Sequence, residues 1–246
     1  MCNADESYAK NPKYARSRAC ACCGIAHEFL AFLLLGGLQV ICYLTVMQNC
    51  WPSGRVRDIS KFDVSSYAAL CDNKLYKDSP ICKKLDNYEG MIEGAKQFCD
   101  AESGVLAISV VSIIVSLVLF FIAMVNACKC CVACCGGKQK KNLINVVFSA
   151  IGSIVALVVW IIYLGLNSAY TQYKTNYEEI TKGAGGTTSE PLEGGFGLFF
   201  EAALIIVLVW GCFLIVQRVV QGALSFMASR EEWKGVDDKL ATVQVA

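Results

Sequence analysis

The chain has 246 residues, of which 55% are hydrophobic and only 17% are charged. Soluble domains carry about 25% charged residues, so this balance excludes an ordinary soluble domain. The formal net charge is +1, which provides no overall field to attract nucleic acid or an acidic substrate.

Four apolar stretches are each long enough to cross about 30 Å of hydrocarbon, which takes about 20 residues in a helix. They are residues 29–47, 104–125, 143–166 and 196–216, and Glu201 is the only formally charged residue in them. A soluble protein would have to bury all four, and little chain remains to cover them. The pattern predicts an all-α membrane protein, an antiparallel bundle of four transmembrane helices.

The segments between the spans differ in charge, and lysine and arginine near span ends mark the cytoplasmic side of a membrane. Residues 1–28 and 126–142 are rich in these basic residues, whereas the connection 167–195 is acidic. We therefore expect both of these basic segments and the tail 217–246 in the cytoplasm. The loops 48–103 and 167–195 then lie outside, in a multi-pass protein of the plasma membrane.

The larger outer loop contains four cysteines, which are Cys50, Cys71, Cys82 and Cys99. An even number in a non-cytoplasmic loop indicates two disulfides. A loop of this length with few large apolar side chains would have a poor core, so cross-links would help to order it. The spacing leaves all three pairings open, and four free thiols in a reducing space are the alternative.

Eight further cysteines lie close to the expected cytoplasmic surface of the membrane. They precede the first span and follow the second: Cys20, Cys22, Cys23, Cys128, Cys130, Cys131, Cys134 and Cys135. Cysteines beside a membrane and near basic residues are typical sites of S-acylation (palmitoylation), which would hold each loop against the inner leaflet. The second group also has spacings that suit zinc, and ordinary reduced thiols are the third interpretation. We expect acylation, with covalent acyl lipids and no other cofactor or metal.

Polar residues inside the spans are the next candidates for a site. Ser109, Ser112 and Ser116 recur at helical spacing on one face of the second span, where small residues favour helix packing. An intramembrane carboxylate such as Glu201 usually faces a partner or a cavity. An ion path or a contact between subunits is its functional interpretation. We favour the structural one, a glutamate that is protonated or hydrogen-bonded near the outer surface, because no intramembrane lysine, arginine or histidine accompanies it.

The third span is followed by a periodic stripe of large side chains. Tyr170, Tyr173, Tyr177 and Ile180 recur at the spacing of one helical face. We therefore expect the third span to continue outward as a helix, as far as the glycine-rich turn at residues 183–186.

No motif in the sequence indicates catalysis. The phosphate-binding glycine motifs are absent. The single histidine, His27, lies at the inner start of the first span, where a boundary role is commonest. No pair of intramembrane carboxylates suggests proteolysis. We therefore expect that the protein is not an enzyme.

The layout of four spans, cytoplasmic ends, a larger first outer loop with cysteines and a shorter second one resembles the claudin and peripheral-myelin-protein superfamily. Three local features carry the resemblance. Trp51 follows the first span, Cys71 and Cys82 are separated by ten residues, and the fourth span opens on the glycine-rich segment 194–197. The resemblance covers the whole topology and places the chain as a distant member.

The chain also departs from that family. The family's G-L-W is missing before Cys71, Cys50 and Cys99 are an extra pair, and the outer loop does not look like a β-sheet. Carried over, the resemblance implies a bridge between Cys71 and Cys82, which leaves Cys50 with Cys99.

The resemblance also implies lateral self-association into strands or arrays. Some protist surface proteins of this broad type, including the pellicle strip protein of euglenids, form ordered rows tied to a submembrane skeleton. We expect a structural membrane-organising protein. Its partners would be membrane lipids, further copies of itself and a submembrane cytoskeletal or scaffold protein that contacts the tail, with no nucleic acid. An auxiliary subunit of a channel or receptor is the alternative, and a pore or transporter that uses Glu201 is the third hypothesis.

Overall fold

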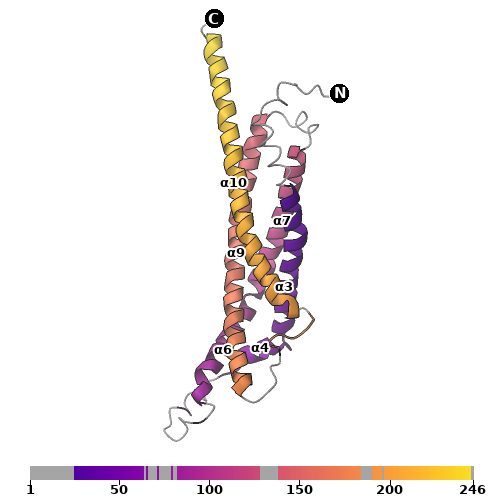
Figure 1. Ribbon diagram of the computed structural model, residues 1–246, viewed down its shortest axis with the longest axis vertical. Coiled ribbons are helices and arrows are strands. Elements are labelled where there is room, and N and C mark those ends of the chain that lie inside the picture. Colours follow the sequence, from indigo (N-terminus) through magenta and orange to yellow (C-terminus); the bar gives the residue numbers. More distant parts are fainter. Residues whose placement is uncertain are drawn as a thin grey trace. The chain divides into compact units, whose positions relative to one another are not determined.

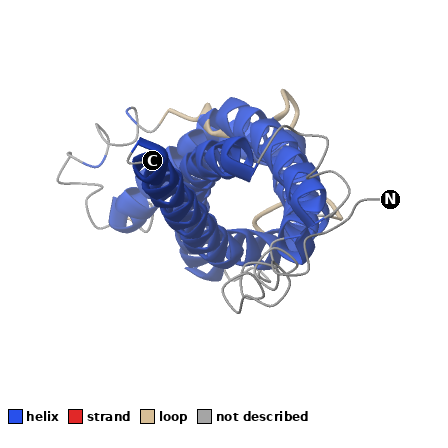
Figure 2. Ribbon diagram, turned by 90° about the horizontal axis from the view of Figure 1, so that it is seen from above, coloured by secondary structure: helices blue, strands red, loops and turns tan. Residues whose placement is uncertain are grey.

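The structure is a computed structural model, and the residues that it describes are 25–63, 65, 71, 79, 82–127, 138–183, 190–195 and 197–244. Within these residues every regular element is a helix, and Figure 2 shows no strand. The two cytoplasmic cysteine groups, at residues 20–23 and 128–135, lie outside the described residues. Their expected acylation therefore stays a prediction.

Four helical stretches are long and apolar enough to cross a membrane. They are Ile25–Cys50, Leu85–Met124, Ile144–Lys182 and Phe199–Met227. Each overlaps one of the four apolar stretches that the sequence predicts. The all-helical class and the four candidate spans of a multi-pass membrane protein are thus confirmed for the described part of the chain.

The individual elements follow one another in a simple order (Figure 1). After helical residues 25–30 they are η1 (Ala31–Leu35), α3 (Gly36–Cys50), α4 (Arg55–Ser60), η2 (Cys82–Lys84), α6 (Leu85–Asp100), α7 (Glu102–Ala127), α9 (Lys138–Gly183) and α10 (Gly197–Gln244). Element η1 is a single turn of π-helix, the form in which π-helices usually occur.

Two of the spans extend well beyond their apolar stretches. Only Ala101 separates α6 from α7, and its N–H donates to the Gln97 carbonyl oxygen while its own carbonyl accepts from the Val105 N–H. The helical backbone hydrogen bonds therefore continue almost unbroken from α6, in the loop with the disulfide cysteines, into the second span. Helix α9 continues to Gly183, as the stripe of tyrosines predicts.

The chain divides into two compact units. The unit that we call the terminal unit comprises Met1–Gly37, Val110–Val159 and Val209–Ala246. The other, which we call the disulfide unit, comprises Leu38–Ser109 and Trp160–Leu208.

An aromatic cluster forms the centre of the disulfide unit. Phe98 of α6, Tyr170 of α9 and Phe200 of α10 have ring centroids 5.0 to 6.1 Å apart. The rings are tilted or edge-on to one another, which are arrangements that aromatic pairs favour. Helices α6 and α9 approach closely beside it. A Cβ atom at Gly94 would lie 2.6 Å from the backbone nitrogen of Tyr173, so only glycine fits there.

Small residues also govern the packing of the terminal unit. A Cβ atom at Gly152 of α9 would lie 2.7 Å from the Leu119 side chain of α7. Ser112 and Ser116 of α7 and Ser149 of α9 are buried as well. Close approach through small residues is how helices associate in lipid, because burial of apolar surface there contributes little to the free energy of association.

Large apolar side chains point outward along the spans of both units. Ile154 of α9 and Phe213 of α10 are each 64% exposed, for example. Cys212 is exposed on the same helix, whereas Cys42 of α3 is buried. An apolar surface of this kind on backbone-satisfied helices matches hydrocarbon surroundings.

Candidate functional site

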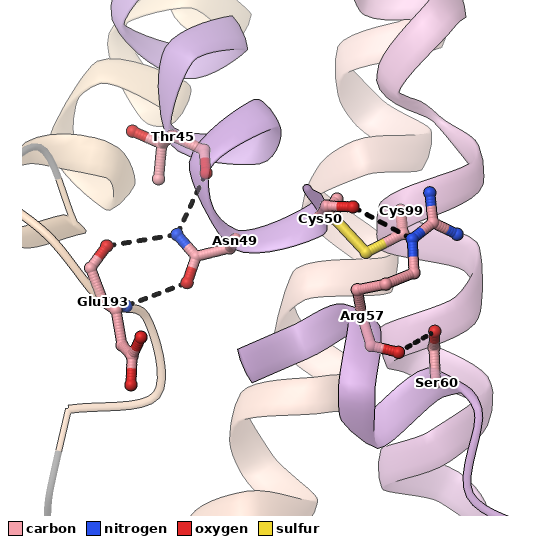
Figure 3. The surroundings of a disulfide bond; sticks show 7 residues. All are labelled: Thr45, Asn49, Cys50, Arg57, Ser60, Cys99 and Glu193. Atoms are coloured by element: carbon pink, nitrogen blue, oxygen red, sulfur yellow. Dashed lines mark hydrogen bonds between the residues drawn. A yellow bond between two sulfur atoms is a disulfide. The ribbon is translucent and has the colours of Figure 1, made fainter. Parts of the chain in front are cut away.

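The disulfide unit contains two disulfides. The structure joins Cys50 to Cys99 and Cys71 to Cys82, which is the pairing that the family resemblance implies. Cys50 is the last residue of α3 and Cys99 lies in the last turn of α6, and both are buried. The Cys50–Cys99 bond therefore ties the end of α3 to the end of α6 (Figure 3).

A buried amide beside this disulfide binds the backbone of the connection between the third and fourth candidate spans. The Nδ2 of Asn49 donates to the carbonyl oxygen of Glu193 at 3.2 Å, and the Glu193 N–H donates to the Asn49 Oδ1 at 2.9 Å (Figure 3). Asn49 also donates to the Thr45 carbonyl oxygen at 3.0 Å. An amide side chain offers both a donor and an acceptor, so it pairs with a backbone N–H and C=O together.

Two arginines of α4 complete the cross-links. The Arg57 Nε donates to the carbonyl oxygen of Cys50 at 2.9 Å (Figure 3). Arg55 forms an ion pair with Glu193 at 2.8 Å and donates to the Glu190 carbonyl oxygen. The end of α3, α4, the end of α6 and residues 190–193 are thus joined by covalent and polar bonds. We call this set the cross-linked platform.

The cross-linked platform carries a pocket and an exposed aromatic residue. The pocket has a volume of about 540 Å³ and is lined by side chains from α4 and α6, including Ile59, Tyr88, Met91 and Ile92. Trp51, which follows α3 directly, is 58% exposed. A concave, mainly apolar surface and a protruding aromatic ring are both typical of contact sites.

The structure supplies Glu201 with a cationic partner that the sequence interpretation lacked. Lys174 of α9 forms an ion pair with the Glu201 Oε1, and the Tyr170 hydroxyl donates to the same oxygen at 2.7 Å. The predicted span ended at residue 166, but α9 continues and carries Lys174 about two turns further. The expectation that Glu201 is hydrogen-bonded fits this geometry, and its cationic partner comes from the extension of α9 outside the predicted span.

Ser109 lies in a separate polar contact of the disulfide unit. Its hydroxyl is 2.9 Å from the Tyr163 hydroxyl, which in turn donates to the Gln39 carbonyl oxygen at 3.4 Å. All three residues are buried. The contact therefore links α3, α7 and α9 through polar groups that have no access to water.

The terminal unit contains a buried charged centre. The Arg218 guanidinium donates two hydrogen bonds to the Glu28 carboxylate, at 3.0 and 2.8 Å. It also donates to the Gly152 carbonyl oxygen at 2.9 Å and to the Ser116 hydroxyl at 3.1 Å. Both charged side chains are 2% exposed. The guanidinium of α10 thus contacts the other three helical segments of this unit.

Sequence reasoning missed this centre. Glu28 immediately precedes the first predicted span and Arg218 follows the fourth by two residues, so both were placed in the cytoplasmic segments 1–28 and 217–246. The available signal was the pair of valines after Arg218, Val219 and Val220, which continue the apolar pattern beyond the predicted end of the span. An arginine followed by further apolar residues of a membrane helix usually has an internal partner.

Among the described residues, no group of three or more histidine, cysteine, aspartate or glutamate side chains is arranged to hold a metal ion. Comparison of the chain with protein-family models, with curated proteins and with solved structures found no match. The site geometry and the sequence pattern are therefore the two sources for a functional proposal.

Proposed function

We propose that this chain is a structural membrane-organising protein that self-associates laterally into strands or arrays in the plasma membrane, as a distant member of the claudin and peripheral-myelin-protein superfamily. The observation that carries the proposal is the cross-linked platform. It holds an exposed aromatic residue, Trp51, and an apolar pocket of about 540 Å³ on one rigid scaffold.

Rigidity favours association, because a surface already fixed by bonds loses little conformational entropy when it is covered. The Cys50–Cys99 disulfide and the Asn49 amide provide that rigidity. Burial of apolar surface does not drive association between helices inside hydrocarbon. Contacts made by the platform, outside the hydrocarbon, would therefore supply most of the selectivity between copies.

The two features of the platform differ in shape, and this difference predicts the kind of assembly. If Trp51 of one copy enters the pocket of the next, the contact joins two different patches. Such head-to-tail contacts leave a free patch at each end, so they produce open strands or closed rings instead of simple dimers. The residues that would surround the indole are Tyr88, Met91 and Ile92.

The charged groups of the spans favour a structural role over a pore. The Glu28 carboxylate and the Arg218 guanidinium neutralise each other in a buried pair, and Glu201 is paired with Lys174. A carboxylate that serves an ion path must be able to exchange its partner for the ion. The two pairs instead hold neighbouring helices together.

The helical tail is the segment that we assign to the submembrane partner. Helix α10 continues from Met227, where its apolar stretch ends, to Gln244 (Figure 1). At 1.5 Å per residue this extension is about 26 Å long. We propose that this helical extension contacts the cytoskeletal or scaffold protein, and that acylated cysteines hold the adjacent loops to the inner leaflet.

The decisive experiment is cryo-electron microscopy of the full-length protein in lipid membranes. Rows or rings of one chain are expected for the wild type, and dispersed copies for Trp51→Ala and for Ile92→Lys, which places a charge in the pocket. Phe213→Ala, a change at an exposed aromatic residue of the terminal unit, is the matched control and should leave the rows intact.

Mixing the two disrupted variants gives the sharper result. A copy with Ile92→Lys keeps Trp51, and a copy with Trp51→Ala keeps the pocket, so the mixture can form a single contact and should yield dimers. Isolated wild-type copies, or rows that persist in both variants, would refute the proposal. Isolated copies that purify with one larger membrane protein at a fixed ratio would instead support an auxiliary subunit.

A further inference from the structure

A second pocket, of about 400 Å³, lies along α9 where the start of α10 meets it in the disulfide unit. Helix α9 lines it with residues of one face, including Lys174, Glu178 and Glu179, and α10 contributes Glu201 and Ile205. We call this pocket the α9–α10 groove. It lies where the apolar part of α9 gives way to its polar extension, and in a membrane protein that transition is expected near the lipid headgroups.

The charged side chains of α9 follow one order along the groove, beyond an apolar patch on α10. At the end nearest the apolar stretch of α9, Ile205 of α10 is 57% exposed and offers a surface to an acyl chain. The cation Lys174 comes next, and the carboxylates of Glu178 and Glu179 lie about one turn, or 6 Å, further along α9. The order is therefore apolar surface, cation, anions.

A zwitterionic phospholipid presents the complementary order. Its acyl chains are followed by a phosphate anion, and its ammonium cation, two carbon atoms further, is the outermost group. We infer that the α9–α10 groove binds a phosphate joined to an ammonium, with the phosphate at Lys174 and the ammonium at Glu178 and Glu179. The inference is independent of the proposed self-association.

Lys174 can hold a phosphate without releasing Glu201. An ammonium group has three N–H donors, and its described partners are the Glu201 and Glu178 carboxylates. The Tyr170 hydroxyl also holds the Glu201 carboxylate in place. One donor of Lys174 thus remains for a phosphate oxygen.

The charge balance of the groove disfavours a purely anionic headgroup. Its lining has three carboxylates, on Glu178, Glu179 and Glu201, against two ammonium groups, on Lys174 and Lys182. A phosphate without an attached ammonium would meet a net negative site. A zwitterion adds no net charge and places its cation beside the excess carboxylate.

The experiment uses the full-length protein in nanodiscs that contain equal amounts of phosphatidylethanolamine and phosphatidylglycerol, which share the phosphate but not the ammonium. Native mass spectrometry then identifies the lipids that stay bound when the protein is released. Preferential retention of phosphatidylethanolamine is expected. Glu179→Lys should lower the ratio of the two retained lipids about tenfold, which corresponds to about 1.4 kcal/mol.

Two further variants make the result specific. Glu89→Lys reverses a charge at an exposed position of α6 outside the groove, and it should leave the lipid ratio unchanged. Thr171→Phe narrows the groove without changing its charge, and it should reduce retention of both lipids. Equal retention of the two lipids by the wild type would overturn the inference, and so would an unchanged ratio for Glu179→Lys.

A last arm distinguishes the source of the ligand. Soluble glycerophosphoethanolamine is added to the protein in discs of phosphatidylglycerol alone. A rise in the thermal midpoint of the wild type that Glu179→Lys lacks would assign the free headgroup as a sufficient ligand. No rise, together with selective lipid retention, would assign the intact membrane lipid.

Discussion

Replacement of Glu28 by leucine tests the charged centre of the terminal unit. The change leaves the Arg218 guanidinium buried without its counter-charge and removes two of its four hydrogen bonds. Hydrogen bonds to charged groups each contribute about 1.5–3 kcal/mol, and breaking a buried ion pair from one side costs about 3–5 kcal/mol. We therefore expect the free energy of unfolding to fall by about 3–5 kcal/mol.

The neutral partner should matter much less. Ser116→Ala removes one hydrogen bond to Arg218 but leaves the ion pair intact. Hydrogen bonds between helices in membranes average about 0.6 kcal/mol and reach about 1.7 kcal/mol. A loss of about 1 kcal/mol is expected, so the ranking of the two variants separates the effect of charge from that of a single bond.

A double variant supplies the critical control. Glu28→Leu combined with Arg218→Met replaces the pair by apolar side chains of similar size, which is often neutral or stabilising. Unfolding by sodium dodecyl sulfate in mild-detergent micelles, followed by circular dichroism, measures the wild type, the single variants Glu28→Leu, Arg218→Met and Ser116→Ala, and the double variant. The reasoning is refuted if Glu28→Leu alone costs less than about 1 kcal/mol, or if the double variant loses the sum of the two single losses.

Three other predictions concern the disulfide unit. Gly94→Ala should destabilise it by about 1–3 kcal/mol, because its Cβ would lie 2.6 Å from the Tyr173 backbone nitrogen. Gly104→Ala, with nothing within 4 Å, should not destabilise it in the same unfolding assay. Asn49→Ala should cost about 1–3 kcal/mol and speed amide hydrogen exchange at Glu193, so unchanged exchange there would contradict the role of the Asn49 amide. Replacing both Cys50 and Cys99 by alanine should cost about 4 kcal/mol, because their disulfide closes a loop of 49 residues. The Cys71–Cys82 disulfide, which closes 11 residues, should contribute about 3 kcal/mol. Equal losses in the two variants would contradict this dependence on loop length.

Several features of the molecule are local, and they could be predicted from residues close together in the chain. The length and hydropathy of the four apolar stretches suffice to indicate spanning helices, because each stretch satisfies its own backbone in hydrocarbon. The tyrosine stripe after residue 166 likewise predicts the continuation of α9, since periodicity is a local signal.

The partners of the charged residues could not be predicted in this way. Glu201 was expected to have no intramembrane cation, and its partner Lys174 belongs to a different helix, 27 residues away, beyond the predicted end of its span. The Glu28–Arg218 pair joins residues separated by 190 positions. The predicted spans ended beside Glu28 and two residues before Arg218, because hydropathy counts each charge as unfavourable even where a distant partner neutralises it.

The sequence by itself determined the four apolar stretches that form candidate membrane-spanning helices, and the even set of cysteines in one long connection. Only the tertiary structure decided which cysteines meet and that Asn49 binds the backbone of Glu193. It also decided that one arginine holds four helical segments together. The physical reason is that hydrophobicity and helical period act over a few turns, whereas a disulfide, an ion pair or an amide contact depends on how distant helices pack.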